Sequence, residues 1–207
     1  MPSDTSPRSG EVSPRQAKHP NLLLHQPMKF IRSPQDPWIT AGGEDGPQPH
    51  PPARAYSLLT LEQWHAVRET WPAGLAVGVG MPNSTDIEVL APDLARISLV
   101  VLQFPKWVDG RAYSQARLLR SRYRYAGELR ATGDVLVDMV PLLARTGFDA
   151  AQLRRDQNLD AAQRALGFFA GHYQGDVLQP KPAFARDVAR ELADAKPAAD
   201  AFAGQGI

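Results

Sequence analysis

The sequence predicts an α/β domain built on a small parallel sheet of about four strands with crossover helices. Short apolar runs of strand length alternate with amphipathic segments of helical length through the middle of the chain. Such alternation implies parallel strands joined by helices. The four runs are too few for a closed eight-stranded barrel, so we expect an open sheet or a half-barrel. The predicted strands are 75–79, 97–103, 128–131 and 148–151.

Proline distribution sets the limits of this domain. Of 19 prolines in 207 residues, 11 precede residue 53. Residues 1–27 combine proline with polar side chains and few aromatics, a composition that cannot offset the entropy cost of ordering. We therefore expect a disordered tail there, one domain over residues 28–195 and a flexible tail over 196–207. The start of the domain, residues 28–40, fits two short extended pieces around a turn.

The first half of the domain shows local signals for each element. Thr60 is a good helix N-cap, and apolar residues recur at helical spacing over 61–71. The strand at 75–79 is followed by the turn residues Gly80-Met81-Pro82-Asn83, and a short helix is expected to reach Leu90. The run ISLVVLQF at 97–104 is apolar and β-branched, which is typical of a buried strand.

In the second half, helices and strands continue to alternate. A helix is predicted over 114–123, and it is followed by the strand at 128–131. The next helix begins at Gly133-Asp134, and Pro141 should kink it or split it near Met139. The remaining helices are predicted at 160–172 and 184–195.

Composition excludes several classes of function. The absence of cysteine excludes disulfides, thiolate metal sites, iron–sulfur ligation and a cysteine nucleophile. A net charge of +1 gives no general attraction to nucleic acid or to a membrane. The histidines lack metal-binding spacing, and no nucleotide-binding or hydrolase motif occurs. We therefore expect no metal, no cofactor and no membrane span, and without a signal-peptide pattern a cytoplasmic location is expected.

The loop over residues 105–113 is the leading candidate for a binding site. Ligand sites in parallel folds gather after the carboxyl ends of strands, and a helix N-terminus beside basic side chains can bind an anion. One hypothesis is an oxyanion site, with Asp109, Tyr113 and Asp134 lining the loop and four anion ligands. The alternative is that Asp109 pairs with Arg111 inside the loop while Ser114 only caps the helix. The hypothetical anion ligands are Lys106, Arg111, Ser114 and Arg130.

Charge is concentrated locally although it cancels over the chain. Residues 106–134 carry seven basic and three acidic side chains, a local charge of +4. Arg117, Arg120 and Arg124 follow i, i+3, i+7 spacing and should share one helix face. Such a face could dock an acidic partner, and the alternative is an ordinary solvated face.

The central segment resembles a known family. DGRAYSQARLLRSRYRYAGELRATGDVLVD at 109–138 is similar to the signature of the bacterial family numbered 934 in the domain-of-unknown-function series. The pieces DPWIT, WPAGLAVGVGMPN, VLQFPKW and GFDA extend the resemblance over about residues 28–170. Ala112 departs from the family's usual glycine, and Gln103 from a frequent glutamate.

The resemblance implies a place in metabolism without a mechanism. Genes of this family typically lie beside the gene of the haemoprotein subunit of assimilatory sulfite (or nitrite) reductase, and members are often labelled probable oxidoreductases. This implies a role in sulfate assimilation, but no catalytic residues come with it. We expect an accessory protein that binds the reductase haemoprotein or an acidic electron carrier. The alternative is a small enzyme or sensor that binds sulfate, sulfite or phosphate at the strand-end loops.

Overall fold

A computed structural model describes residues 28–32, 35–42, 46, 48–168 and 172–187, so the predicted tails at 1–27 and 196–207 lie outside the described residues. Seven strands form one sheet in the order β1-β7-β6-β5-β4-β3-β2. All pairings between neighbours are parallel. The strands are β1 Lys29–Phe30, β2 Ile39–Thr40, β3 Ser57–Thr60, β4 Val77–Met81, β5 Leu99–Phe104, β6 Glu128–Gly133 and β7 Ala150–Ala151.

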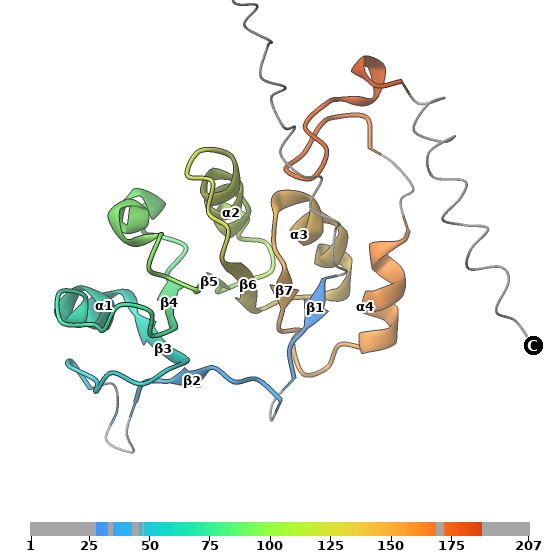
Figure 1. Cartoon of the computed structure of the whole chain (residues 1–207). Coiled ribbons are helices and arrows are strands. Elements are labelled where there is room, and N and C mark those ends of the chain that lie inside the picture. The colour runs from blue at the N-terminus through green and yellow to red at the C-terminus, as the bar shows by residue number, and fades with distance from the viewer. Residues whose placement is uncertain (1–27, 33–34, 43–45, 47, 169–171, 188–207) are drawn as a thin grey trace, which may run out of the picture.

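The helical segments cover one face of this sheet (Figure 1). Strands β3 to β7 follow one another in chain order, and the connections between them lie on the same side. The result is a half-barrel, which confirms the predicted class with more strands than the sequence indicated. The α-helices are α1 Leu61–Val67, α2 Arg111–Ser121, α3 Val140–Thr146 and α4 Leu159–Leu166, and the 3₁₀ segments are η1 Ile87–Asp93, η2 Val137–Met139 and η3 Ala183–Ala185.

Local rules explain where these helices begin. The Thr60 hydroxyl accepts a hydrogen bond from the Gln63 amide (3.2 Å), and the Gln63 side chain accepts one from the Thr60 amide (2.9 Å). This capping box confirms the predicted start of α1. Pro141 lies in the first turn of α3, directly after the separate turn η2, so the expected split near Met139 is also confirmed. Of the helix predicted at 184–195, residues 184–187 are described: the first two end η3, the next two are not helical, and 188–195 lie outside the described residues.

The two extended pieces near residue 28 do not lie side by side. Strand β1 pairs with β7 at one edge of the sheet, and β2 pairs with β3 at the opposite edge. The chain therefore passes from edge to edge, below the strands in Figure 1. We call residues 35–38 the crossing segment. Trp38 in this segment lies against Gly78, where an added Cβ would be 3.0 Å from the indole ring.

Arg130 ties the crossing segment to the sheet. Its neighbours in β6, Leu129 and Ala131, belong to the core under the helices, so Arg130 points to the opposite face. The guanidinium donates to Glu128 Oε1 at 2.8 and 3.0 Å and to Asp36 Oδ2 at 2.5 Å. Only 4% of Arg130 is exposed, and the two carboxylates offset the free-energy cost of burying its charge.

Gly133, at the end of β6, has a backbone conformation and surroundings that do not accommodate a side chain. It has φ of +95°, and an added Cβ would lie 2.3 Å from the Phe104 carbonyl oxygen. We expect Gly133→Ala to lower the free energy of unfolding by about 2–3 kcal/mol, because strain and a backbone clash combine. Gly74, with φ of +82° and open space around it, is the matched control. Gly74→Ala should cost about 1 kcal/mol in urea unfolding, and equal costs at both positions would contradict this reading.

Candidate functional site

The carboxyl ends of β5, β6 and β7 bring three loops together. We call this group the strand-end site; it contains the turn Lys106–Asp109, Asp134 and Arg154. In the turn, the Asp109 amide donates to the Lys106 carbonyl at 2.9 Å, which places Trp107 and Val108 at its two central positions. Both side chains are mostly exposed, at 54% for Trp107 and 65% for Val108.

Asp134 holds this turn in place. Its Oδ2 accepts from the Trp107 amide at 2.9 Å, and its Oδ1 accepts from Arg154 Nη1 at 2.7 Å. Arg154 also binds Asp156 through two contacts of 2.7 Å. The Trp107 amide, followed by Arg154, keeps the pKa of Asp134 below its usual range, and Arg154 lowers the pKa of Asp156 to about 2. Both carboxylates are therefore ionised at neutral pH.

Asp109 and Arg111 pair within the loop, as the alternative hypothesis expected. Asp109 accepts from Arg111 Nε at 3.0 Å, from Nη2 at 2.6 Å and from the Arg111 amide at 3.3 Å. The Arg111 side chain holds the pKa of Asp109 well below its usual range. The anion beside the first turn of α2 is thus the protein's own Asp109 carboxylate.

The predicted oxyanion ligands do not come together. Helix α2 begins at Arg111 rather than Ser114, so Ser114 is an exposed residue inside the first turn and does not cap the helix. Arg111 is engaged by Asp109, and Arg130 is enclosed by Asp36 and Glu128 on the uncovered face of the sheet. Lys106, the remaining predicted ligand, is exposed, and it has no carboxylate partner among the residues that the structure describes.

Tyr113 is a packing residue beside the strand-end site. Its ring meets Phe104 edge-on, with 5.0 Å between the ring centroids. Burial, with a smaller effect from the Asp138 carboxylate, raises the pKa of Tyr113 to about 12. The phenol is therefore neutral in the physiological range, where it can donate a proton in a hydrogen bond but does not act as a base.

Two buried side-chain amides, one on α2 and one in the loop after β4, could not be identified from the sequence. Gln115 Nε2 donates to the carbonyls of Pro82 (3.1 Å) and Thr85 (2.8 Å), which fixes the loop after β4. Asn83 in that loop is 7% exposed, and its side chain faces Asp109, whose pKa it lowers further after the larger effect of Arg111. Buried polar side chains are usually hydrogen-bonded, and these two amides connect the loop after β4 to α2 and to the turn that contains Asp109.

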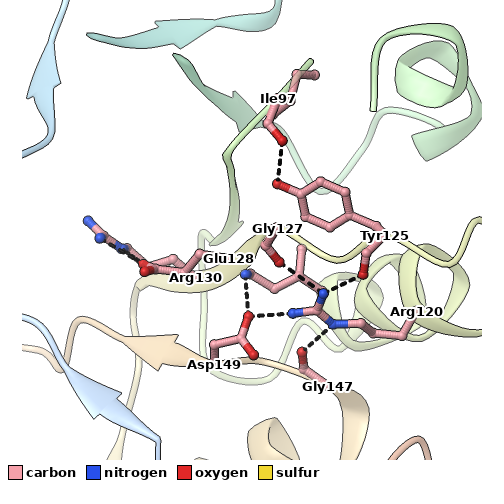
Figure 2. Close-up of polar contacts among 9 residues, drawn as sticks. Ile97, Arg120, Tyr125, Gly127, Glu128, Arg130, Gly147 and Asp149 are labelled. Atoms are coloured by element: carbon pink, nitrogen blue, oxygen red, sulfur yellow. Dashed lines mark hydrogen bonds and ion pairs between the residues drawn. The ribbon is translucent and has the colours of Figure 1, made fainter. Parts of the chain in front are cut away.

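Arg120 is an internal tie and not a docking residue (Figure 2). Its guanidinium donates to the carbonyls of Gly147 (2.9 Å), Tyr125 (2.5 Å) and Gly127 (2.9 Å), and it forms an ion pair with Asp149. The same Asp149 oxygen accepts from the Leu129 amide at 2.8 Å. These contacts join the end of α2 to the amino ends of β6 and β7, and they leave the Arg120 side chain only 13% exposed.

The expected basic stripe on one helix face is therefore wrong. Arg124 lies beyond the end of α2 with φ of +53°, so it does not continue the helical spacing. Arg120 points into the network just described. Arg117 is the member of the three that stays on the exposed side of α2, and no carboxylate pairs with its side chain among the described residues.

Two features bear on the kind of site. Within the described part of the chain, no three histidine or carboxylate side chains gather closely enough to hold a metal ion. Over the same residues, no helix has the length and apolar character needed to cross a membrane.

The two arginines on α2 make a matched pair for mutation. Arg120→Met should lower the free energy of unfolding by about 3 kcal/mol, because it leaves buried carbonyl groups without a hydrogen-bond donor and one carboxylate without its ion-pair partner. Arg117→Met, one turn earlier and exposed, should change it by less than about 0.5 kcal/mol. Urea unfolding of both variants tests this, and an Arg120 variant as stable as the Arg117 variant would refute the internal role.

The lowered carboxylate pKa values predict how the turn responds to acid. A carboxylate whose pKa is depressed by folding stabilises its contacts above its unfolded pKa, about 3.9, and loses them as pH falls through the folded value. The amide signal of Trp107 in NMR spectra should therefore stay unchanged from neutral pH down to that range and move only below it. Asp134→Ala should abolish the transition. A midpoint above about 3.9 in the unaltered protein would show that Asp134 does not hold the turn.

Comparison with known proteins adds one match. The family model described as "Bacterial protein of unknown function (DUF934)" matches residues 78–184, just over half of the chain. The matched region runs from β4 to η3 and includes the whole strand-end site and the Arg120 network. No curated protein matches the chain.

Proposed function

Because the chain belongs to the DUF934 family of bacterial proteins of unknown function, we propose that it is an accessory protein of assimilatory sulfite (or nitrite) reduction. In this role it binds the reductase haemoprotein or the acidic carrier that delivers electrons to it. The choice of pathway rests on the gene neighbourhood that the family resemblance implies. The choice of a binding role rests on the side chains of the chain itself.

The observation that carries the binding role is a set of unpaired basic side chains along α2. Lys106 precedes this helix, Arg117 lies on its exposed side, and Arg124 follows its end. All three are exposed, and among the described residues none of their side chains pairs with a carboxylate. Exposed charges of one sign attract an oppositely charged partner and speed its association. An acidic electron carrier, or an acidic region of the reductase, fits this surface.

The strand-end site supports binding more than catalysis. Its carboxylates Asp109 and Asp134, and the adjacent Asp156, are engaged by arginine, and their lowered pKa values make them weak bases at neutral pH. These contacts serve to fix a loop. The oxyanion-binding alternative has less support, because Arg111 and Arg130 already hold carboxylates of the protein.

The test is direct binding to the purified reductase haemoprotein and, separately, to a ferredoxin-type electron carrier at low salt. The double variant Arg117→Glu, Arg124→Glu should bind at least ten-fold more weakly, and the difference should shrink as salt is added because salt screens surface charge. The control is Arg54→Glu with Arg164→Glu, which makes the same charge change at two other exposed arginines.

Two outcomes would contradict the proposal. One is that the unaltered protein binds neither the haemoprotein nor the carrier at low salt. The other is that both double variants lose affinity equally, which would mean that only total charge matters and that α2 is not the docking surface.

A further inference from the structure

The turn Lys106–Asp109 exposes an unusual pair of residues. The central positions of β-turns are commonly occupied by glycine, proline, asparagine or aspartate, which fit the turn backbone and water. Here they hold Trp107 and Val108, each with more than half of its surface exposed. The two residues are adjacent in the chain and lie at the tip of one turn, so this tip exposes two apolar side chains.

This apolar tip sits on a backbone fixed from three sides. The Trp107 amide is bound by Asp134, the Asp109 amide closes the turn, and Asp109 is anchored to Arg111. Asp134 in turn follows Gly133, whose backbone conformation leaves no room for a side chain. A tip that is ordered before binding loses little entropy when a partner covers it.

The charges around the tip favour a protein over a lipid surface. Lys106, Arg111 and Arg154 lie beside three carboxylates, so these six side chains carry no net charge, and the exposed Arg117 and Arg124 lie further along α2 and beyond its end. An anionic membrane attracts clusters of basic residues, and a balanced ring gives it little to attract. An apolar centre with a polar margin is the usual anatomy of a protein interface, in which tryptophan is a frequent energetic hot spot. The carboxylates are Asp109, Asp134 and Asp156.

We propose that Trp107 and Val108 are the apolar anchor of the docking surface, and that they insert into an apolar recess of a folded protein partner. This inference rests on the proposed function and commits to the acidic electron carrier as the partner, because the exposed Lys106 and Arg117 complement an acidic surface; binding to the reductase haemoprotein instead is the other outcome of the test. Arg117 and Arg124 then act on the approach of the partner, and Trp107 acts on the lifetime of the complex. The two contributions differ in their response to salt, which separates them by experiment.

The experiment measures dissociation constants of the full-length protein for both partners, at low and at high salt. Trp107→Ala should weaken binding at least ten-fold at both salt concentrations, because burial of an indole depends little on ionic screening. Val108→Ala should have a smaller effect of the same kind. Ile39→Ala, on the edge strand β2 and 71% exposed, is the matched control and should bind like the unaltered protein.

Folding does not confound this comparison. The hydrogen bond of Trp107 to Asp134 comes from the backbone amide, so Trp107→Ala retains it, and the urea midpoint should be unchanged. A second variant, Asp134→Ala, keeps the indole but releases the turn. It should also weaken binding, through a slower association or a faster dissociation caused by loss of order.

The outcomes separate the inference from the proposed function. If the unaltered protein binds a partner and Trp107→Ala binds it equally well, the anchor is refuted and the proposed function stands. If the unaltered protein binds neither partner, the proposed function fails and the anchor fails with it. If the protein instead binds vesicles of anionic lipid in a way that requires Trp107, the protein-anchor inference is overturned in favour of a membrane.

Discussion

The fold depends on a constraint of parallel sheets whose helices lie on one side only. Such a sheet must cover its second face by other means, because alternate side chains of every strand point there. In this protein Leu99 and Val101 point to that face and are nevertheless buried. The N-terminal chain that joins the two edges provides cover, and Arg130 connects it to β6 through Asp36. Short edge strands that look dispensable in the sequence therefore complete the half-barrel.

Arginine has two distinct uses in the region of concentrated positive charge. Some guanidinium groups form only contacts that hold the protein together: Arg120 binds three carbonyls and a carboxylate, and Arg130 binds two carboxylates. Others stay exposed, as Arg117 does, with no carboxylate partner in the part of the chain that the structure describes. A local charge of +4 from the sequence therefore overstates the surface available to a partner. The remaining exposed basic side chains lie along α2 and beyond its end, and the turn that carries Trp107 directly precedes the start of this helix.

Sequence patterns predicted those features that depend on neighbouring residues. The Thr60 cap, the split at Pro141 and the four central strands all follow from local chemistry, and the structure confirms them. The edge strands β1 and β2 have two residues each and show no periodicity, and β1 pairs with residues about 120 positions later in the chain. Helical spacing could not show that Arg120 would meet the backbone of β6 and β7. The exposure of Trp107 likewise could not be predicted, because it depends on the turn, and the turn depends on a contact with Asp134, which is distant in the sequence.

We propose that this half-barrel presents a fixed, apolar turn at the start of α2, and that this turn binds a protein of sulfite reduction. Site-specific photo-crosslinking tests it most directly, with a photoreactive amino acid in place of Trp107 in cells that contain the reductase. We expect a crosslink between position 107 and the electron carrier or the haemoprotein, and none from the same group at exposed Leu142. Equal crosslinking from both positions, or crosslinks from position 107 only to lipid, would contradict it.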